Sequence, residues 1–134
     1  MLTFEVRTRD REQFVEITEQ VRKALESARV RSGSVLVYVP HTTAGVTINE
    51  NADPDVIHDM LLTLGRLVPK DAAGYRHTEG NSDSHVKASM MGSSCRVIVH
   101  EGRLVLGTWQ GIYLCEFDGP RTRSVHVQFQ RNDE

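Results

Sequence analysis

The sequence is poor in the features that would assign a protein class on their own. Its 134 residues include only two cysteines and four prolines, and no apolar run approaches the roughly 18 residues that span a bilayer. The first ten residues lack the apolar stretch of a secretory signal. Cys95 and Cys115 are too few for a disulfide framework, so we expect reduced thiols in a cytoplasmic protein.

An excess of positive charge is also missing. The chain has 16 Lys and Arg residues against 18 Asp and Glu residues, for a formal net charge of −2. A broad basic surface for nucleic acid is therefore excluded, and we expect neither a nucleic-acid nor a membrane partner. The expected partner is a small molecule or another protein.

The order of the patterns along the chain indicates the fold class. No internal repeat, low-complexity tract or linker interrupts the sequence, so residues 1–134 are predicted to form one domain. Helical patterns come mainly before Gly92, and strand patterns follow one another after it. This order predicts an α+β domain with a mostly antiparallel sheet, curled or sandwiched, and a few helices.

Strands are expected where apolar and polar residues alternate or where β-branched residues gather. The predicted strands cover residues 2–9, 14–17, 35–39, 45–48, 96–100, 103–106, 112–117 and 124–130. Pro40 ends the third of them, because proline cannot donate to a strand ladder.

Three helices are predicted from caps and apolar spacing. The first begins with Thr18 as its cap, and the second begins at Asp53-Pro54, a good cap followed by a residue suited to the first helical position. Pro69 stops the second helix, and residues 70–83 form a long polar loop. The third helix covers residues 84–91 and ends at Gly92.

Two windows of the sequence combine carboxylates and imidazoles while excluding positive charge. Between Arg31 and Arg66 there is no Lys or Arg, and the same holds from His77 to Val86. The windows hold His41, Glu50, Asp53, Asp55, His58, Asp59, His77, Glu79, Asp83 and His85. Imidazole nitrogen with carboxylate oxygen suits Zn²⁺ or a similar ion better than Mg²⁺.

Structural roles compete with this interpretation. Acids at a helix start are favoured by the helix dipole without any ligand, which is the better interpretation for Asp55 and Asp59. His41, His77 and His85 are the stronger ligand candidates because each lies in a loop or at the end of an element. Asp83 either converges on an ion with His85 or caps the following helix, and the spacing alone does not separate the two.

Several other residues have a structural and a functional interpretation. Trp109 either stacks on an aromatic ligand or, as the favoured interpretation, fills a gap in the core. Thr42 and Thr43 either donate to a substrate or serve a strand. The two cysteines fall in predicted strands, where buried and unreactive thiols are expected.

Three blocks of the sequence resemble one protein family. They are His41-Thr42-Thr43-Ala44-Gly45-Val46-Thr47-Ile48-Asn49-Glu50-Asn51-Ala52-Asp53-Pro54, His77-Thr78-Glu79-Gly80-Asn81-Ser82-Asp83-Ser84-His85-Val86-Lys87-Ala88-Ser89, and residues 106–121, which contain Gly107-Thr108-Trp109-Gln110-Gly111 and Glu116-Phe117-Asp118-Gly119-Pro120-Arg121. The blocks are similar to the signature of the YjbQ-type family, often named secondary thiamine-phosphate synthase enzymes. The family more often has Ala where this chain has Ser82 and Ser84.

The resemblance implies a homotrimer with a divalent metal ion, and it implies metal ligands at His41, His77 and His85. The activity attached to the family joins a pyrimidine diphosphate to a thiazole phosphate and releases pyrophosphate. For that transferase chemistry, Glu50, Asp53 and Lys87 are the catalytic candidates. The candidates for binding the phosphorylated substrate are Trp109, Arg121, Thr42 and Thr43. Zn²⁺ fits the histidines better than the Mg²⁺ usual in pyrophosphate chemistry.

Two other functions are also compatible with the sequence. One is a metal-dependent hydrolase in which Glu50 or Glu79 acts as the base. The other is a trimer that binds a metal or a small ligand without catalysis, since the sequence contains no diagnostic catalytic motif.

Overall fold

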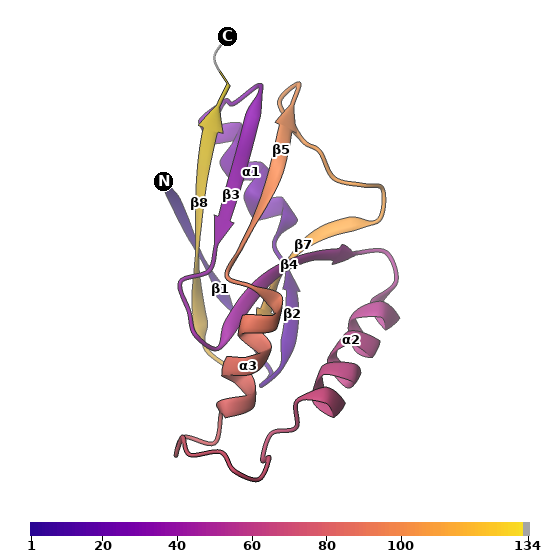
Figure 1. The fold of residues 1–134 in the computed structure, drawn as a ribbon. Helices are drawn as coiled ribbons and strands as arrows, with labels where there is room; N and C mark the ends of the chain where they lie inside the picture. The colour runs from indigo at the N-terminus through magenta and orange to yellow at the C-terminus, as the bar shows by residue number, and fades with distance from the viewer. Residues whose placement is uncertain (133–134) are drawn as a thin grey trace.

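A computed structural model describes residues 1–132 as two antiparallel sheets and three helices (Figure 1). The first sheet has the strand order β1 (Leu2–Arg7), β8 (Thr122–Arg131), β3 (Gly33–Tyr38), β5 (Ser94–His100) and β6 (Arg103–Leu104). The second has the order β2 (Gln13–Glu16), β7 (Gln110–Glu116) and β4 (Ala44–Glu50). The helices are α1 (Thr18–Ala28), α2 (Pro54–Leu67) and α3 (Ser82–Met91). The predicted α+β class with antiparallel sheets is confirmed.

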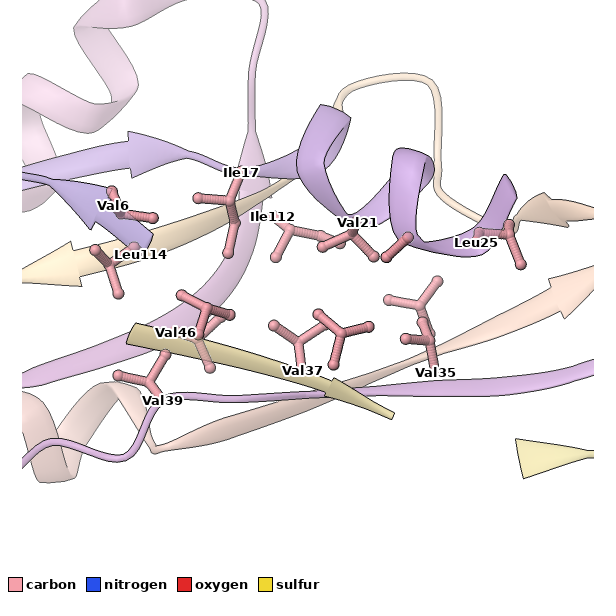
Figure 2. Packing of buried hydrophobic residues seen from close by; sticks show 14 of the residues in the cluster. Val6, Ile17, Val21, Leu25, Val35, Val37, Val39, Val46, Ile112 and Leu114 are labelled. Carbon is pink, nitrogen blue, oxygen red and sulfur yellow. The ribbon is translucent and has the colours of Figure 1, made fainter. Parts of the chain in front are cut away.

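The main core lies between the first sheet and a layer made of the second sheet and α1 (Figure 2). Alternation along the strands explains it, because every second side chain of β3, β5 and β8 points inward. Val35 and Val37 of β3 thus meet Val21 of α1 and Val46 of β4.

A second apolar cluster covers the opposite face of the second sheet. Phe14, Tyr113 and Phe117 pack there against Leu64 of α2 and Ala88 of α3. The strand β7 is therefore buried on both faces, which explains its nearly continuous buried run from Gly111 to Glu116. The helices α2 and α3 lie side by side over this cluster, and the long segment 68–81 connects them (Figure 1).

The start of α1 differs from the prediction. Thr18 does not cap the helix: Ile17 occupies the cap position, without a side-chain bond, and Thr18 is the first helical residue. The buried Thr18 hydroxyl instead accepts the Ile112 N–H at 2.9 Å and donates to the Glu16 carboxylate at 2.8 Å. The Thr18 hydroxyl bonds to β7 instead of capping the helix, because this bond satisfies a backbone N–H that is buried.

The other two helices follow the sequence more closely. Asp53 accepts the N–H of Asp55 at 2.9 Å, so the predicted cap of α2 is confirmed. The helix α3 begins two residues earlier than predicted, with Asn81 rather than Asp83 or Ser84 at the cap position. No helix within residues 1–132 is long and apolar enough to cross a membrane.

Candidate functional site

The site begins where β3 leaves its neighbour β8. Tyr38 pairs with His126, so a continued β3 would place residue 40 opposite Ser124. Pro40 ends the strand, and the backbone N–H of Ser124 has no strand partner on that side. The His41 ring replaces the missing strand, because its Nε2 accepts this N–H at 2.9 Å. His41 thus completes a backbone ladder as well as lying at a candidate site.

The surroundings of His41 keep its ring uncharged. Partial burial and the positive charge of Arg123 lower the pKa of His41 below its ordinary value of 6.5, and Arg121 acts in the same direction. Glu116 opposes them more weakly. The ring is therefore neutral at neutral pH.

A hollow of about 450 Å³ lies between the 41–44 segment and α3. Its lining consists of two imidazoles, three hydroxyls and small residues: His41, Thr42, Ala44, His85, Ala88, Ser89, Gly92 and Ser93. His85, Ala88 and Ser89 lie on one face of α3 at helical spacing. This volume is in the range of small-molecule sites, which span roughly 300–1,000 Å³.

The close approach of β4 to the end of α3 shapes this hollow. A β-carbon at Gly45 would stand 2.7 Å from the carbonyl oxygen of Gly92, so only glycine fits there. The same carbonyl accepts the N–H of Val46 at 3.0 Å.

His77 lies against His85 from the loop before α3. The two rings meet edge to face, with their centroids 5.4 Å apart and an interplanar angle of 87°. His77 Nε2 is also 3.4 Å from a carboxylate oxygen of Glu79. Among residues 1–132, no three His, Cys, Asp or Glu side chains are grouped closely enough to hold a metal ion. His85 therefore contacts the ring of His77, and it also lines the hollow together with His41.

One buried ion cluster anchors α3. The Lys87 ammonium is 2.9 Å from Asp83, one turn away on the same helix, and 2.8 Å from Glu12. Arg11 also pairs with Asp83 at 3.0 Å. Burial alone would raise the pKa of Asp83, but the bonds from Arg11 and Lys87 outweigh it and hold the pKa below its usual value. Asp83 does not cap the helix, so the capping interpretation is wrong. Its convergence with His85 on an ion stays a prediction, and the ion pairs with Arg11 and Lys87 give it no support.

The ion cluster also decides what Lys87 contacts. Its side chain is 1% exposed and does not line the hollow. A catalytic role of Lys87 stays a prediction, and this arrangement gives it no support.

A second buried ion pair lies behind His41. Arg123 Nε donates to Glu116 at 3.0 Å, and Arg123 Nη2 donates to the Thr43 hydroxyl at 2.9 Å and to its carbonyl oxygen at 3.2 Å. Thr8 donates to the Glu116 carboxylate at 2.8 Å. Thr43 is therefore buried behind the hollow, whereas Thr42 lines it.

Sequence reasoning missed these residues. The available signal was charge at inward positions: Arg123 alternates with the core residues Val125 and Val127, and Glu116 follows an apolar run. Charged residues at such positions are paired when buried.

The remaining candidates lie outside the hollow. Arg121 donates to the carbonyl and carboxylate of Asp118 at 2.9 and 3.1 Å, and half of its side chain is exposed. It is close enough to His41 to lower the histidine pKa.

Glu50, Asp53 and Trp109 collect at the opposite end of β4. Glu50 pairs with Gln110, and the carbonyl of Trp109 accepts the Asn51 N–H at 2.9 Å. Ala44, at the other end of the strand, lines the hollow, and seven strand residues span about 20 Å. Trp109 is 62% exposed, so the expectation that it fills a core gap is wrong. Within one chain, these three residues do not share a site with His85.

Both thiols have the expected placement in strands. Burial raises the pKa of Cys95 to about 11 and raises that of Cys115 further. Neither is a ready nucleophile at neutral pH.

Comparison with known proteins gives consistent matches over nearly the whole chain. A family model described as UPF0047 protein YjbQ-like matches residues 2–132. The UPF0047 protein YugU of Bacillus subtilis is 51% identical over 126 residues, covering 94% of this chain and 96% of that protein. The UPF0047 protein MJ1081 of Methanocaldococcus jannaschii is 47% identical over 128 residues, covering 96% and 92%.

The fold of this chain also agrees closely with a crystal structure of a similar protein. A YjbQ/UPF0047 protein from Clostridium acetobutylicum superposes with a TM-score of 0.95 at 51% identity. The match covers 97% of this chain and all of the other.

Proposed function

The chain belongs to the YjbQ-like UPF0047 family, and we propose that it binds a divalent metal ion through His77 and His85 beside a small-ligand site. The observation that carries this proposal is the geometry of the two rings, with centroids 5.4 Å apart. The ligand site is the hollow lined by His41, Thr42, Ser89 and Ser93.

The ring separation fits two ligands of one ion. A zinc–nitrogen bond is about 2.0–2.1 Å, which puts two ring centres on one tetrahedral ion roughly 5 Å apart. His77 is 44% exposed at its side chain, so an ion can reach the pair from solvent.

Imidazole ligands favour Zn²⁺ over Mg²⁺, in agreement with the sequence. Glu79 is close enough to His77 to orient its ring. Such an ion supplies Lewis acidity to a ligand beside it. The three hydroxyls of the hollow, on Thr42, Ser89 and Ser93, fix that ligand by hydrogen bonds.

The reaction implied by the resemblance, thiamine-phosphate synthesis from two phosphorylated precursors, is the more specific part of the proposal. Arg121 supports it as a partly exposed cation near His41. Glu50, Asp53 and Trp109 lie at the far end of β4, so they take part only if another subunit brings them to the hollow. Product formed above the level of a His85→Ala control tests this reaction, and no product with any divalent ion contradicts it.

A metal-dependent hydrolase is the second candidate, and the contact between Glu79 and His77 favours it. Glu79 lies beside the proposed ion, where a general base would be needed, whereas Glu50 does not. Metal-dependent hydrolysis that a Glu79→Gln variant abolishes, with zinc still bound, supports the hydrolase.

The assembly and the location belong to the proposal as well. A homotrimer rests on the family resemblance, and a cytoplasmic location rests on the cysteine usage. Light scattering of the purified protein tests the trimer, and a mass of one or two chains contradicts it.

Metal analysis tests the proposed function. Untagged protein reconstituted with zinc is expected to hold near-stoichiometric metal, and His77→Ala and His85→Ala are expected to lose it. His58→Ala is the matched control, because that histidine is exposed on α2. A folded wild type without zinc, or full zinc in both variants, contradicts the proposal.

A further inference from the structure

We propose that His41 is a fixed hydrogen-bond donor to the ligand rather than a metal ligand, and that buried Arg123 is the positioning residue that keeps it so. The inference deepens the proposed function, since it concerns the same hollow. It rests on three features: the bond from Ser124 to His41, the anchoring of Thr43, and the burial of the Arg123–Glu116 pair.

The hydrogen bond from Ser124 fixes the position of the proton on the His41 ring. A backbone N–H can only donate, so the Nε2 that receives the Ser124 N–H at 2.9 Å must offer a lone pair. In a neutral imidazole the single proton then resides on Nδ1. His41 therefore has an N–H, not a lone pair, at its second nitrogen.

Neither nitrogen of His41 suits a metal ion. An ion on Nδ1 would move the ring proton to Nε2, where it would face the Ser124 N–H, donor against donor. An ion on Nε2 would displace the Ser124 N–H and leave a backbone donor without its partner, which is costly in a partly buried position. His77 and His85 have no such bond to a backbone donor among the hydrogen bonds of residues 1–132.

Arg123 holds the 41–43 loop against β8. Arg123 precedes Ser124 in β8, and its guanidinium grips Thr43, two residues after His41. One residue thus joins the strand that gives the hydrogen bond to the loop that receives it. Glu116 pairs with the guanidinium and also accepts from Thr8 and the Asp118 N–H.

The burial of this pair points to a positioning role. Arg123 and Glu116 are 2% and 0% exposed. Apolar residues of similar volume often stabilise a core as well as a buried ion pair does, so stability alone is a weak reason for the pair. A planar guanidinium gives several directed donors at once, which apolar packing cannot do.

The consequence is a hollow with two chemically different sides. The His77–His85 side binds the ion, and the His41 side donates to an acceptor atom of the ligand. The ligand class is a small molecule with a lone-pair oxygen, as in a phosphate, carboxylate or carbonyl, within reach of both. A group that offers only N–H donors is rejected, because it would face the Nδ1 proton.

Long-range ¹H–¹⁵N NMR of the histidine rings tests the proton position directly. The full chain is measured without and with one equivalent of zinc, and the His41 signals are assigned by their loss in a His41→Gln variant. We expect the Nδ1–H tautomer for His41 in both samples, with zinc-dependent shifts confined to His77 and His85. An Nε2–H tautomer, or a zinc-dependent change at the His41 nitrogens, overturns the proposal.

The role of Arg123 is tested in the same spectra. Arg123→Lys keeps the positive charge beside Glu116 but loses the guanidinium hydrogen bonds to Thr43. We therefore expect His41 to change from one tautomer to a mixture of two. Thr43→Val, which removes only the hydroxyl acceptor, is expected to cause a smaller change in the same direction. Lys87→Met is the control, because it breaks the other buried ion cluster without touching the 41–43 loop.

An unchanged His41 tautomer in both Arg123→Lys and Thr43→Val overturns the positioning role. The outcome is separate from that of the metal analysis. The His41 tautomer in zinc-free protein reports on this inference whether or not the His77–His85 pair binds an ion.

Discussion

The two buried ion clusters lie behind opposite walls of the same hollow, and they differ in how they are closed off. Arg123 and Glu116 are sealed in the interior and hold the 41–43 loop. Lys87 and Asp83 hold α3, which carries His85, and their outer partners Arg11 and Glu12 remain partly exposed. The sealed pair has no substitute partner within the described residues, whereas Asp83 has two cations. Asp83 is therefore neutralised by two side chains, whereas Glu116 is neutralised by one.

Arg123→Met is expected to have the largest effect. It leaves the Glu116 carboxylate buried and without a cation, which costs about 3–5 kcal/mol of unfolding free energy. Urea unfolding followed by circular dichroism measures it. A loss no larger than that of a surface substitution would show that the pair is dispensable. The double variant Arg123→Met, Glu116→Leu is the control, because it removes the unpaired charge and should recover part of the loss.

Lys87→Met should cost less, about 2–3 kcal/mol, because Arg11 still neutralises Asp83. The same unfolding measurement applies. Adding Arg11→Gln to Lys87→Met should then cost more than Arg11→Gln does alone. Strict additivity of the two substitutions would contradict shared neutralisation of Asp83.

The pH dependence of stability is expected to separate the clusters further. The pKa of Asp83 is lowered in the folded protein, so its contribution is fully present above the unfolded value of about 3.9. It is lost as the pH falls through the folded value. The difference in unfolding free energy between wild type and Asp83→Asn should therefore shrink below about pH 4. A difference independent of pH from 3 to 7 would contradict this sign.

Trp109→Ala should have the smallest effect, below about 0.5 kcal/mol, because the side chain is 62% exposed and lies in neither cluster. Thermal unfolding of the two proteins at the same concentration measures it. A large loss that grows at lower protein concentration would place Trp109 in an interface between chains.

Much of the fold was predictable because local rules agreed with the tertiary packing. Asp53-Pro54 starts α2 as expected, and the alternation of residues 124–130 predicted β8. Thr18 was misassigned because a capping residue has a second use when a buried N–H from β7 comes within reach. That N–H is 94 residues away in sequence and leaves no local trace.

The candidate site was predictable only in part, for a similar reason. Loop positions drew attention to His41, His77 and His85, and these residues do lie around one helix end. The family resemblance ranked His41 and His85 ahead of His77 as metal ligands. The sequence could not show that His41 Nε2 is already bonded, since that bond depends on the pairing of β3 with β8. The sequence offered Lys87 as a catalytic candidate without showing its ion pair with Glu12, because Glu12 precedes β2 and is distant in sequence.

The most direct measurement is anomalous diffraction at the zinc absorption edge from crystals of the zinc-loaded protein. We expect one ion, about 2.0–2.1 Å from a nitrogen of both His77 and His85, with His41 still bonded to the Ser124 N–H. An ion bound to a His41 nitrogen would contradict it. So would zinc-loaded crystals with no anomalous peak between His77 and His85.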